Sequence, residues 1–121
     1  MTTNVRPPPV VLVLGTGALD PSPLPFASFT ASRFQIVDER HTPAGVAAAR
    51  ALRPDVVIVD VGQDHGKGLD LCRALQAEHQ TRSIPLIAIT GDPAIGQFMM
   101  TMRVKVCNED TLTDEIELLI A

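Results

Sequence analysis

The chain is poor in aromatic residues, and its basic residues do not outnumber the acidic ones. Of its 121 residues four are Phe, and it has neither Trp nor Tyr. Surfaces that stack nucleobases need aromatic rings, and surfaces that bind phosphates need clustered Lys and Arg. The ten Lys and Arg are scattered and are outnumbered by fourteen Asp and Glu, which gives a formal net charge of −4. This composition argues against a nucleic-acid partner.

Cysteine is scarce too, and long apolar runs are missing. The two cysteines, Cys72 and Cys107, have no metal-binding or redox spacing, so we expect reduced thiols. No apolar run approaches the roughly 18 residues of a membrane span, and the N-terminus carries no basic-then-apolar signal pattern. We therefore expect a soluble cytoplasmic protein with no membrane partner.

What the chain does have is a series of short apolar runs separated by helical patterns. Its length fits one domain, and 45 % hydrophobic residues are enough for a core. Runs such as Val56–Val59, with no polar alternation, are typical of strands buried on both faces of a parallel sheet. The prolines of Arg6-Pro7-Pro8-Pro9 predict a disordered proline-rich arm over residues 1–9, which leaves 10–121 as the domain. The predicted strands are 10–14, 34–37, 55–61, 86–89 and 103–107, and the predicted helices start near Pro25, Pro43, Gly68 and Pro93 and, with Asn108 as the N-cap of the last helix, directly after Asn108.

Strict alternation of strands and helices predicts an α/β fold. We expect a flavodoxin-like three-layer sandwich whose five-stranded parallel sheet has the order 2-1-3-4-5, with a shortened helix 4. In such sheets, sites form outside the carboxyl ends of the strands. Asp60 ends the third strand and is followed by a glycine-rich loop. It would lie at the switch point of the sheet, beside Gly15 and Thr16.

From residue 34 onward the chain resembles the receiver domain of bacterial two-component response regulators. The stretch 53–61 is similar to the third strand of that family, which ends in the phosphoacceptor aspartate, and Gly68 stands where the family opens its third helix. The stretch 84–91 resembles the fourth strand with its phosphate-sensing Thr or Ser, and 105–112 resembles the family's Lys-Pro segment. The resemblance implies that Asp60 is the candidate phosphoacceptor and that Thr90 and Lys105 are the candidate phosphate contacts.

The chain departs from the family at the metal site. Receivers carry an acidic pair after the first strand, which holds Mg²⁺ together with the phosphoacceptor and a backbone carbonyl two residues beyond it. Here Gly15 and Thr16 replace that pair, so only Asp60 and the Gly62 carbonyl would be left. Mg²⁺ prefers oxygen ligands that include one or two carboxylates. Asp38 would lie two strand spacings, about 10 Å, from the third strand, which is too far for direct chelation. We expect no cofactor, or at most weak Mg²⁺ binding.

Three functions stay open. Removal of the acidic pair removes like-charge repulsion, so Asp60 could pair with Lys105 without a metal. That favours a pseudo-receiver, a non-enzymatic response-regulator module in phosphorelay signalling that works by protein–protein interaction with no or weak phosphorylation. The alternative is a functional receiver, a phosphoprotein modified on Asp60 by a histidine kinase. A third reading is a small-ligand or nucleotide-binding flavodoxin-like domain that uses Gly15–Gly17 and Asp38, although prolines interrupt the helix that would hold a phosphate.

The segment between the fourth and fifth strands is shorter than in receivers, and it is rich in apolar residues. These residues are either core or a surface for a protein partner, because a short helix cannot bury all of them. A histidine kinase, a phosphotransfer protein, an effector or a second copy of the chain would be the partner. The candidate interaction surface consists of Phe98, Met99, Met102 and Val106.

Overall fold

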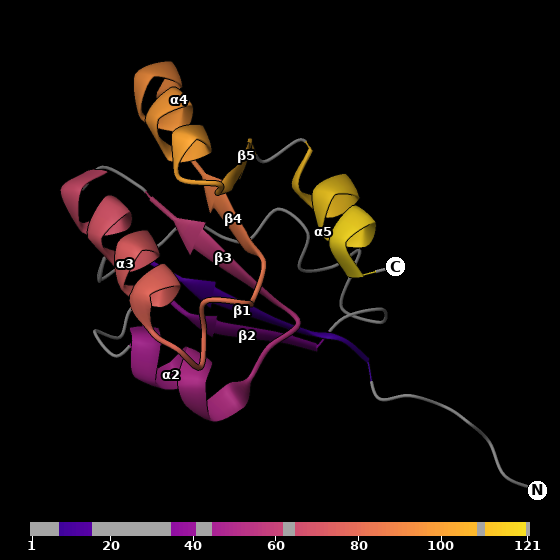
Figure 1. Ribbon diagram of the computed structural model, residues 1–121. Coiled ribbons are helices and arrows are strands. Elements are labelled where there is room, and N and C mark those ends of the chain that lie inside the picture. The colour runs from indigo at the N-terminus through magenta and orange to yellow at the C-terminus, as the bar shows by residue number, and fades with distance from the viewer. Residues whose placement is uncertain (1–7, 16–34, 41–44, 62–64, 109–110, 121) are drawn as a thin grey trace, which may run out of the picture.

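The structure, a computed structural model, describes residues 8–15, 35–40, 45–61, 65–108 and 111–120, and from residue 35 onward its described elements alternate between strand and helix (Figure 1). Residues 1–7 of the arm predicted over 1–9, the predicted helix near Pro25 and the start expected near Pro43 lie outside the described residues. No helix in these described ranges is long and apolar enough to cross a membrane. The elements are β1 (Val10–Leu14), β2 (Gln35–Glu39), α2 (Gly45–Leu52), β3 (Val56–Asp60), α3 (His65–Ala77), β4 (Leu86–Ile89), α4 (Pro93–Thr101), β5 (Lys105–Cys107) and α5 (Leu112–Ile120).

The five strands form one sheet of order β2-β1-β3-β4-β5 in which every neighbouring pair is parallel. This confirms the predicted fold class and strand order. In the register of the sheet, Asp60 pairs with Ile89, and Ile89 pairs with Cys107. The carboxyl ends of the central strands therefore lie at one edge of the sheet. Asp60 is partly exposed at this edge, so its carboxylate can contact other side chains.

The period of two along each strand divides the core into two layers. Leu12, Leu14, Val57 and Val59 face the side covered by α2, α3 and α4, where Cys72, Leu75 and Met99 pack against them. Val11, Val13 and Ile58 face the opposite side, where α5 contributes Leu112 and Ile116. Figure 1 shows α2 and α3 on one face of the sheet and α5 on the other. Burial of each such side chain contributes about 1.5–3 kcal/mol to the stability of the fold. The packed sheet therefore holds the residues at its edge in fixed positions.

Helix α3 begins earlier than the sequence predicts. It starts at His65, so Gly68 lies inside the helix and does not open it. A Cβ at Gly68 would come within 3.0 Å of the Val61 side chain. Glycine at this position therefore lets α3 pack closely against the end of β3.

Helix α4 is short, as expected, and Asp92 caps it. The Asp92 carboxylate accepts hydrogen bonds from the amides of Ala94 and Ile95, and Pro93 occupies the first turn, where its missing N–H costs nothing. The pattern of the sequence did not reveal this cap.

The apolar residues of α4 divide between core and surface. Met99 is completely buried, and Met102 and Val106 are partly buried against the same core. The prediction that Met99 belongs to an interaction surface is therefore wrong, because its position on the helix points it at the sheet. Phe98 and Met100 point outward, with 45 % and 63 % of their surface exposed.

Candidate functional site

The candidate site is built around Arg40, the residue that follows β2. Its Nε and Nη2 donate to the two carboxylate oxygens of Asp38, each at 3.0 Å. Its Nη1 donates to Oδ2 of Asp60, also at 3.0 Å. Arg40 is only 5 % exposed, although the Asp38 and Asp60 side chains keep 36 % and 28 % of their exposure. One buried guanidinium thus joins carboxylates from two strands that do not touch each other.

The charges at this site favour a permanently protonated Arg40. Burial opposes its charge, but the hydrogen bonds and the attraction of Asp38 and Asp60 outweigh burial and raise the pKa of the guanidinium. The contact with Asp38 is the bidentate fork that makes arginine–carboxylate pairs strong and directional. Within the described residues, every buried side-chain nitrogen and oxygen has a hydrogen-bond partner. The buried guanidinium therefore has carboxylate partners for its charge within the site.

Gly15 lies directly beside the backbone and Cβ of Arg40. Strand β1 separates β2 from β3, and Gly15 follows the last residue of β1. A Cβ at Gly15 would lie 2.9 Å from Cβ of Arg40 and 3.0 Å from its carbonyl oxygen. The end of β2 therefore approaches the end of β1 more closely than any residue with a side chain would allow.

The described residues do not fit Mg²⁺. Gly15 offers no carboxylate, and Oδ2 of Asp60 already accepts a hydrogen bond from a cation. The part of the chain that the structure describes contains no group of three or more His, Cys, Asp or Glu side chains that could hold a metal ion. Thr16 and Gly62, the other two positions of the expected metal site, lie outside the described residues.

Lys105 does not reach Asp60. Asp60 lies level with Ile89 and Cys107 in the sheet, so Lys105 sits two positions before the edge. It shares a strand face with Cys107, which packs on the α5 side, and its Nζ lies 3.3 Å from Oε2 of Glu115 in α5. The expected ion pair between Asp60 and Lys105 is therefore wrong, and Arg40 takes its place.

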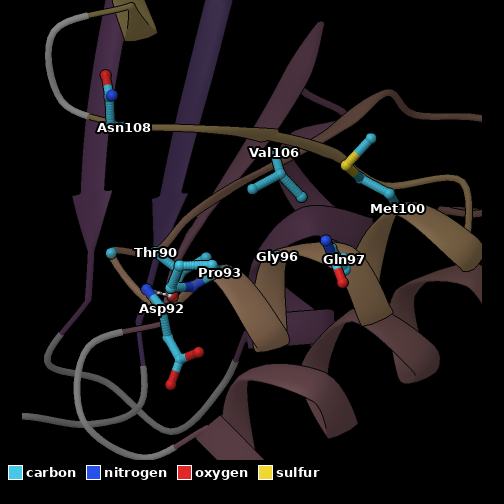
Figure 2. Close-up of a pocket in the computed structure, with 9 residues that line it drawn as sticks. Thr90, Asp92, Pro93, Gly96, Gln97, Met100, Val106 and Asn108 are labelled. Atoms are coloured by element: carbon cyan, nitrogen blue, oxygen red, sulfur yellow. Dashed lines mark hydrogen bonds between the residues drawn. The ribbon is translucent and has the colours of Figure 1, made fainter.

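Thr90 lies at the same edge, directly after β4. Its hydroxyl accepts a hydrogen bond from the Asp92 amide at 3.1 Å, so it helps to begin α4. An open pocket of about 340 Å³ lies between the start of α4 and β5, and Thr90 is one of the residues that line it. Figure 2 shows Thr90 beside Asp92 and Pro93 at the start of α4. Val106 forms the floor of the pocket, and a Cβ at Gly96 would touch Val106 at 3.3 Å. Thr90 stays a candidate contact for a phosphoryl group.

Sequence reasoning missed Arg40, the central residue of the site. Two signals were present: the acidic pair was replaced by Gly15 and Thr16, and a basic residue stood directly after the second strand. The use of Asp38 in a small-ligand or nucleotide site is also disfavoured, because both oxygens of that carboxylate already accept hydrogen bonds from Arg40.

Comparison with known proteins identifies the fold. No protein-family model matches the chain, and no curated protein matches it. The chemotaxis response regulator CheY4 of Vibrio cholerae superposes with a TM-score of 0.69 at 16% identity, covering 94% of this chain and 100% of that one. A response regulator from Desulfuromonas acetoxidans gives 0.68 at 21% identity, covering 92% and 95%. The signal receiver domain of a histidine kinase from Syntrophus aciditrophicus gives 0.61 at 23% identity, covering 93% and 89%. The chain has the fold of these receiver domains.

Proposed function

We propose that this chain is an atypical receiver module of phosphorelay signalling, which acts by binding a protein partner with no or weak phosphorylation of Asp60. The observation that carries the proposal is the ion pair of Asp60 with the buried Arg40. Phosphoryl transfer requires an attacking oxygen in line with the leaving group and cations that neutralise the transferred group. In this site the guanidinium of Arg40 is paired with the attacking carboxylate of Asp60 itself. The described residues around Asp60 do not suit Mg²⁺.

A partner surface on α4 supports the interaction role. Phe98 and Met100 are large apolar side chains that solvent reaches, and the guanidinium of Arg73 lies 5.8 Å from the centre of the Phe98 ring. Met100 also lines the pocket that leads back to Thr90 (Figure 2). Exposed apolar side chains beside a pocket are typical of protein-binding surfaces. The partner on this surface is a histidine kinase, a phosphotransfer protein or an effector, and the module is not itself an enzyme.

Intact-mass spectrometry and amide NMR test the proposal directly. The wild-type protein and Asp60→Asn are each incubated with Mg²⁺ and a small phosphodonor, or with beryllofluoride. We expect no added phosphoryl mass on either protein and no shift of the Asp60 or Thr90 amides. A conventional receiver treated in parallel is the positive control. Near-complete phosphorylation of the wild type that disappears in Asp60→Asn would refute the proposal.

A second candidate is a receiver that is phosphorylated on Asp60, and the exposure of this side chain favours it. The Asp60 carboxylate keeps 28 % of its exposure and lies beside the strand that leads to Thr90, so a donor could reach it. Partner binding separates the two candidates. An interaction module should bind its partner equally well as wild type and as Asp60→Asn, whereas a phosphorylation-dependent receiver should lose binding in that variant.

A further inference from the structure

The path of Arg40 across the sheet depends on the residue at position 15. Arg40 has to span the width of β1, because its partners lie on β2 and β3, about two strand spacings or 10 Å apart. A Cβ at Gly15 would meet Cβ, Cα and the carbonyl oxygen of Arg40 at 2.9, 3.2 and 3.0 Å. These are not the far atoms of a flexible side chain, so a side chain at position 15 would push the whole end of β2 away.

The charge of Arg40 also bears on metal binding. The guanidinium is buried and donates to both oxygens of Asp38 and to one oxygen of Asp60. A divalent cation beside Asp60 would have to approach a fixed positive charge at low dielectric, and that repulsion is strong. It would also have to break a charge-assisted hydrogen bond. Conversely, a carboxylate at position 15, one of the two positions of the expected acidic pair, would need a Cβ where the structure leaves little room for one.

From these two constraints we infer that Arg40 is a built-in cation that takes the place of a divalent metal, and that Gly15 is the residue that admits it. The site holds the internal cation or a metal ion, but not both, and the residue types at positions 15 and 40 decide which. Gly15 is a positioning residue that acts through Arg40. The inference deepens the proposed function. It rests on that function only in assuming that Asp60 stays paired with Arg40 while the protein functions.

NMR on four proteins tests this inference: wild type, Gly15→Ala, the double variant Gly15→Asp/Arg40→Gln, and Arg50→Gln as a matched control. Arg50 is an exposed arginine whose Nε lies 3.9 Å from Oε1 of Glu78. The first readout is the exchange of the Arg40 Nε–H with water. We expect slow exchange in the wild type and the control, and exchange about tenfold faster, which corresponds to about 1.4 kcal/mol, in Gly15→Ala.

The second readout is a Mg²⁺ titration that follows the Asp60 amide and the melting temperature. We expect saturable shifts and a higher melting temperature in the double variant at millimolar Mg²⁺, and neither effect in the wild type or Arg50→Gln. Saturable Mg²⁺ binding by the wild type, or a folded double variant that binds none, would overturn the inference. Unchanged exchange of Arg40 in Gly15→Ala would overturn the role of Gly15.

Two further outcomes remain decisive. If Gly15→Ala does not fold, the double variant is not expected to fold either, because its side chain at position 15 meets the same atoms of residue 40, and Arg40→Gln alone is then titrated with Mg²⁺. This variant keeps Gly15 and removes the guanidinium from Asp38 and Asp60, so we expect Mg²⁺-dependent shifts of the Asp60 amide that the wild type lacks, and their absence would overturn the inference. Phosphorylation of the wild type on Asp60 without Mg²⁺ would refute the proposed function and leave the built-in cation intact, so the two failures can be told apart.

Discussion

Replacement of the buried Arg40 by Gln should destabilise the protein more than removal of an exposed charge such as Arg50, and the structure allows the cost to be worked out. Three side-chain hydrogen bonds to carboxylates are lost. Bonds of this kind contribute about 1.5–3 kcal/mol each when fully buried. Asp38 and Asp60 are 36 % and 28 % exposed, so water replaces part of the loss, and the burial penalty of the guanidinium is relieved. We expect the free energy of unfolding to fall by about 2–3 kcal/mol.

A double-mutant cycle with Asp60→Asn isolates the part of that energy that belongs to the ion pair. Urea unfolding of the wild type, the two single variants and the double variant should give a coupling energy of about 1–2 kcal/mol, with unchanged m-values. Asp60→Asn alone should destabilise, whereas in a site crowded with carboxylates the same change would relieve repulsion and stabilise. The control Arg50→Gln should cost less than about 0.5 kcal/mol. A coupling energy near zero, or a stabilised Asp60→Asn, would refute the reasoning.

Three further predictions concern the rest of the fold. Burial raises the pKa of the thiols of Cys72 and Cys107 to about 11, with the charge of Glu115 adding to the effect at Cys107. The folded protein holds these two protons more tightly than the unfolded chain does. The thiols should therefore leave the free energy of unfolding unchanged below about pH 9, and above it each should lower this free energy by about 1.4 kcal/mol per pH unit. Urea titrations of Cys72→Ala/Cys107→Ala should show a flatter dependence on pH. Met99→Ala should cost about 2–5 kcal/mol in urea unfolding because it leaves a cavity, and Met100→Ala less than about 0.5 kcal/mol; equal costs would mean that α4 is turned differently. Asp92→Ala should lower the melting temperature through loss of about 1 kcal/mol of capping, while Asp92→Asn should keep most of it, and an unchanged Asp92→Ala would show that the cap does not form.

The sequence was most informative where burial alone decides structure. Val56–Val59 has no polar residue, which permits only a strand covered on both faces, and the structure buries all four. The same logic located β1 and β4 to within a residue. It was less informative for α4, because an apolar residue such as Met99 or Met100 gives the same signal whether it faces the core or the solvent. The phase of that helix is set by the sheet that it covers.

The candidate site, too, could be predicted from the sequence only in part. Local sequence was enough to place Asp60 at the carboxyl end of the third strand and to show that the acidic pair is missing. It could not choose the partner of Asp60, because Arg40 and Lys105 are both basic residues near strand ends. The choice depends on the register of β5, which turns Lys105 toward Glu115, and on the strand order, which brings Arg40 across β1.

The sequence by itself thus determined the strand order of the sheet and the position of the central carboxylate, since each follows from hydrophobic periodicity and chain order. Only the tertiary structure decided which charge neutralises that carboxylate. The pairing of Arg40 with Asp60 joins residues on strands that are not neighbours, and it needs the close approach of two strand ends at Gly15. Such a contact depends on distances across the sheet, which no pattern along the chain encodes.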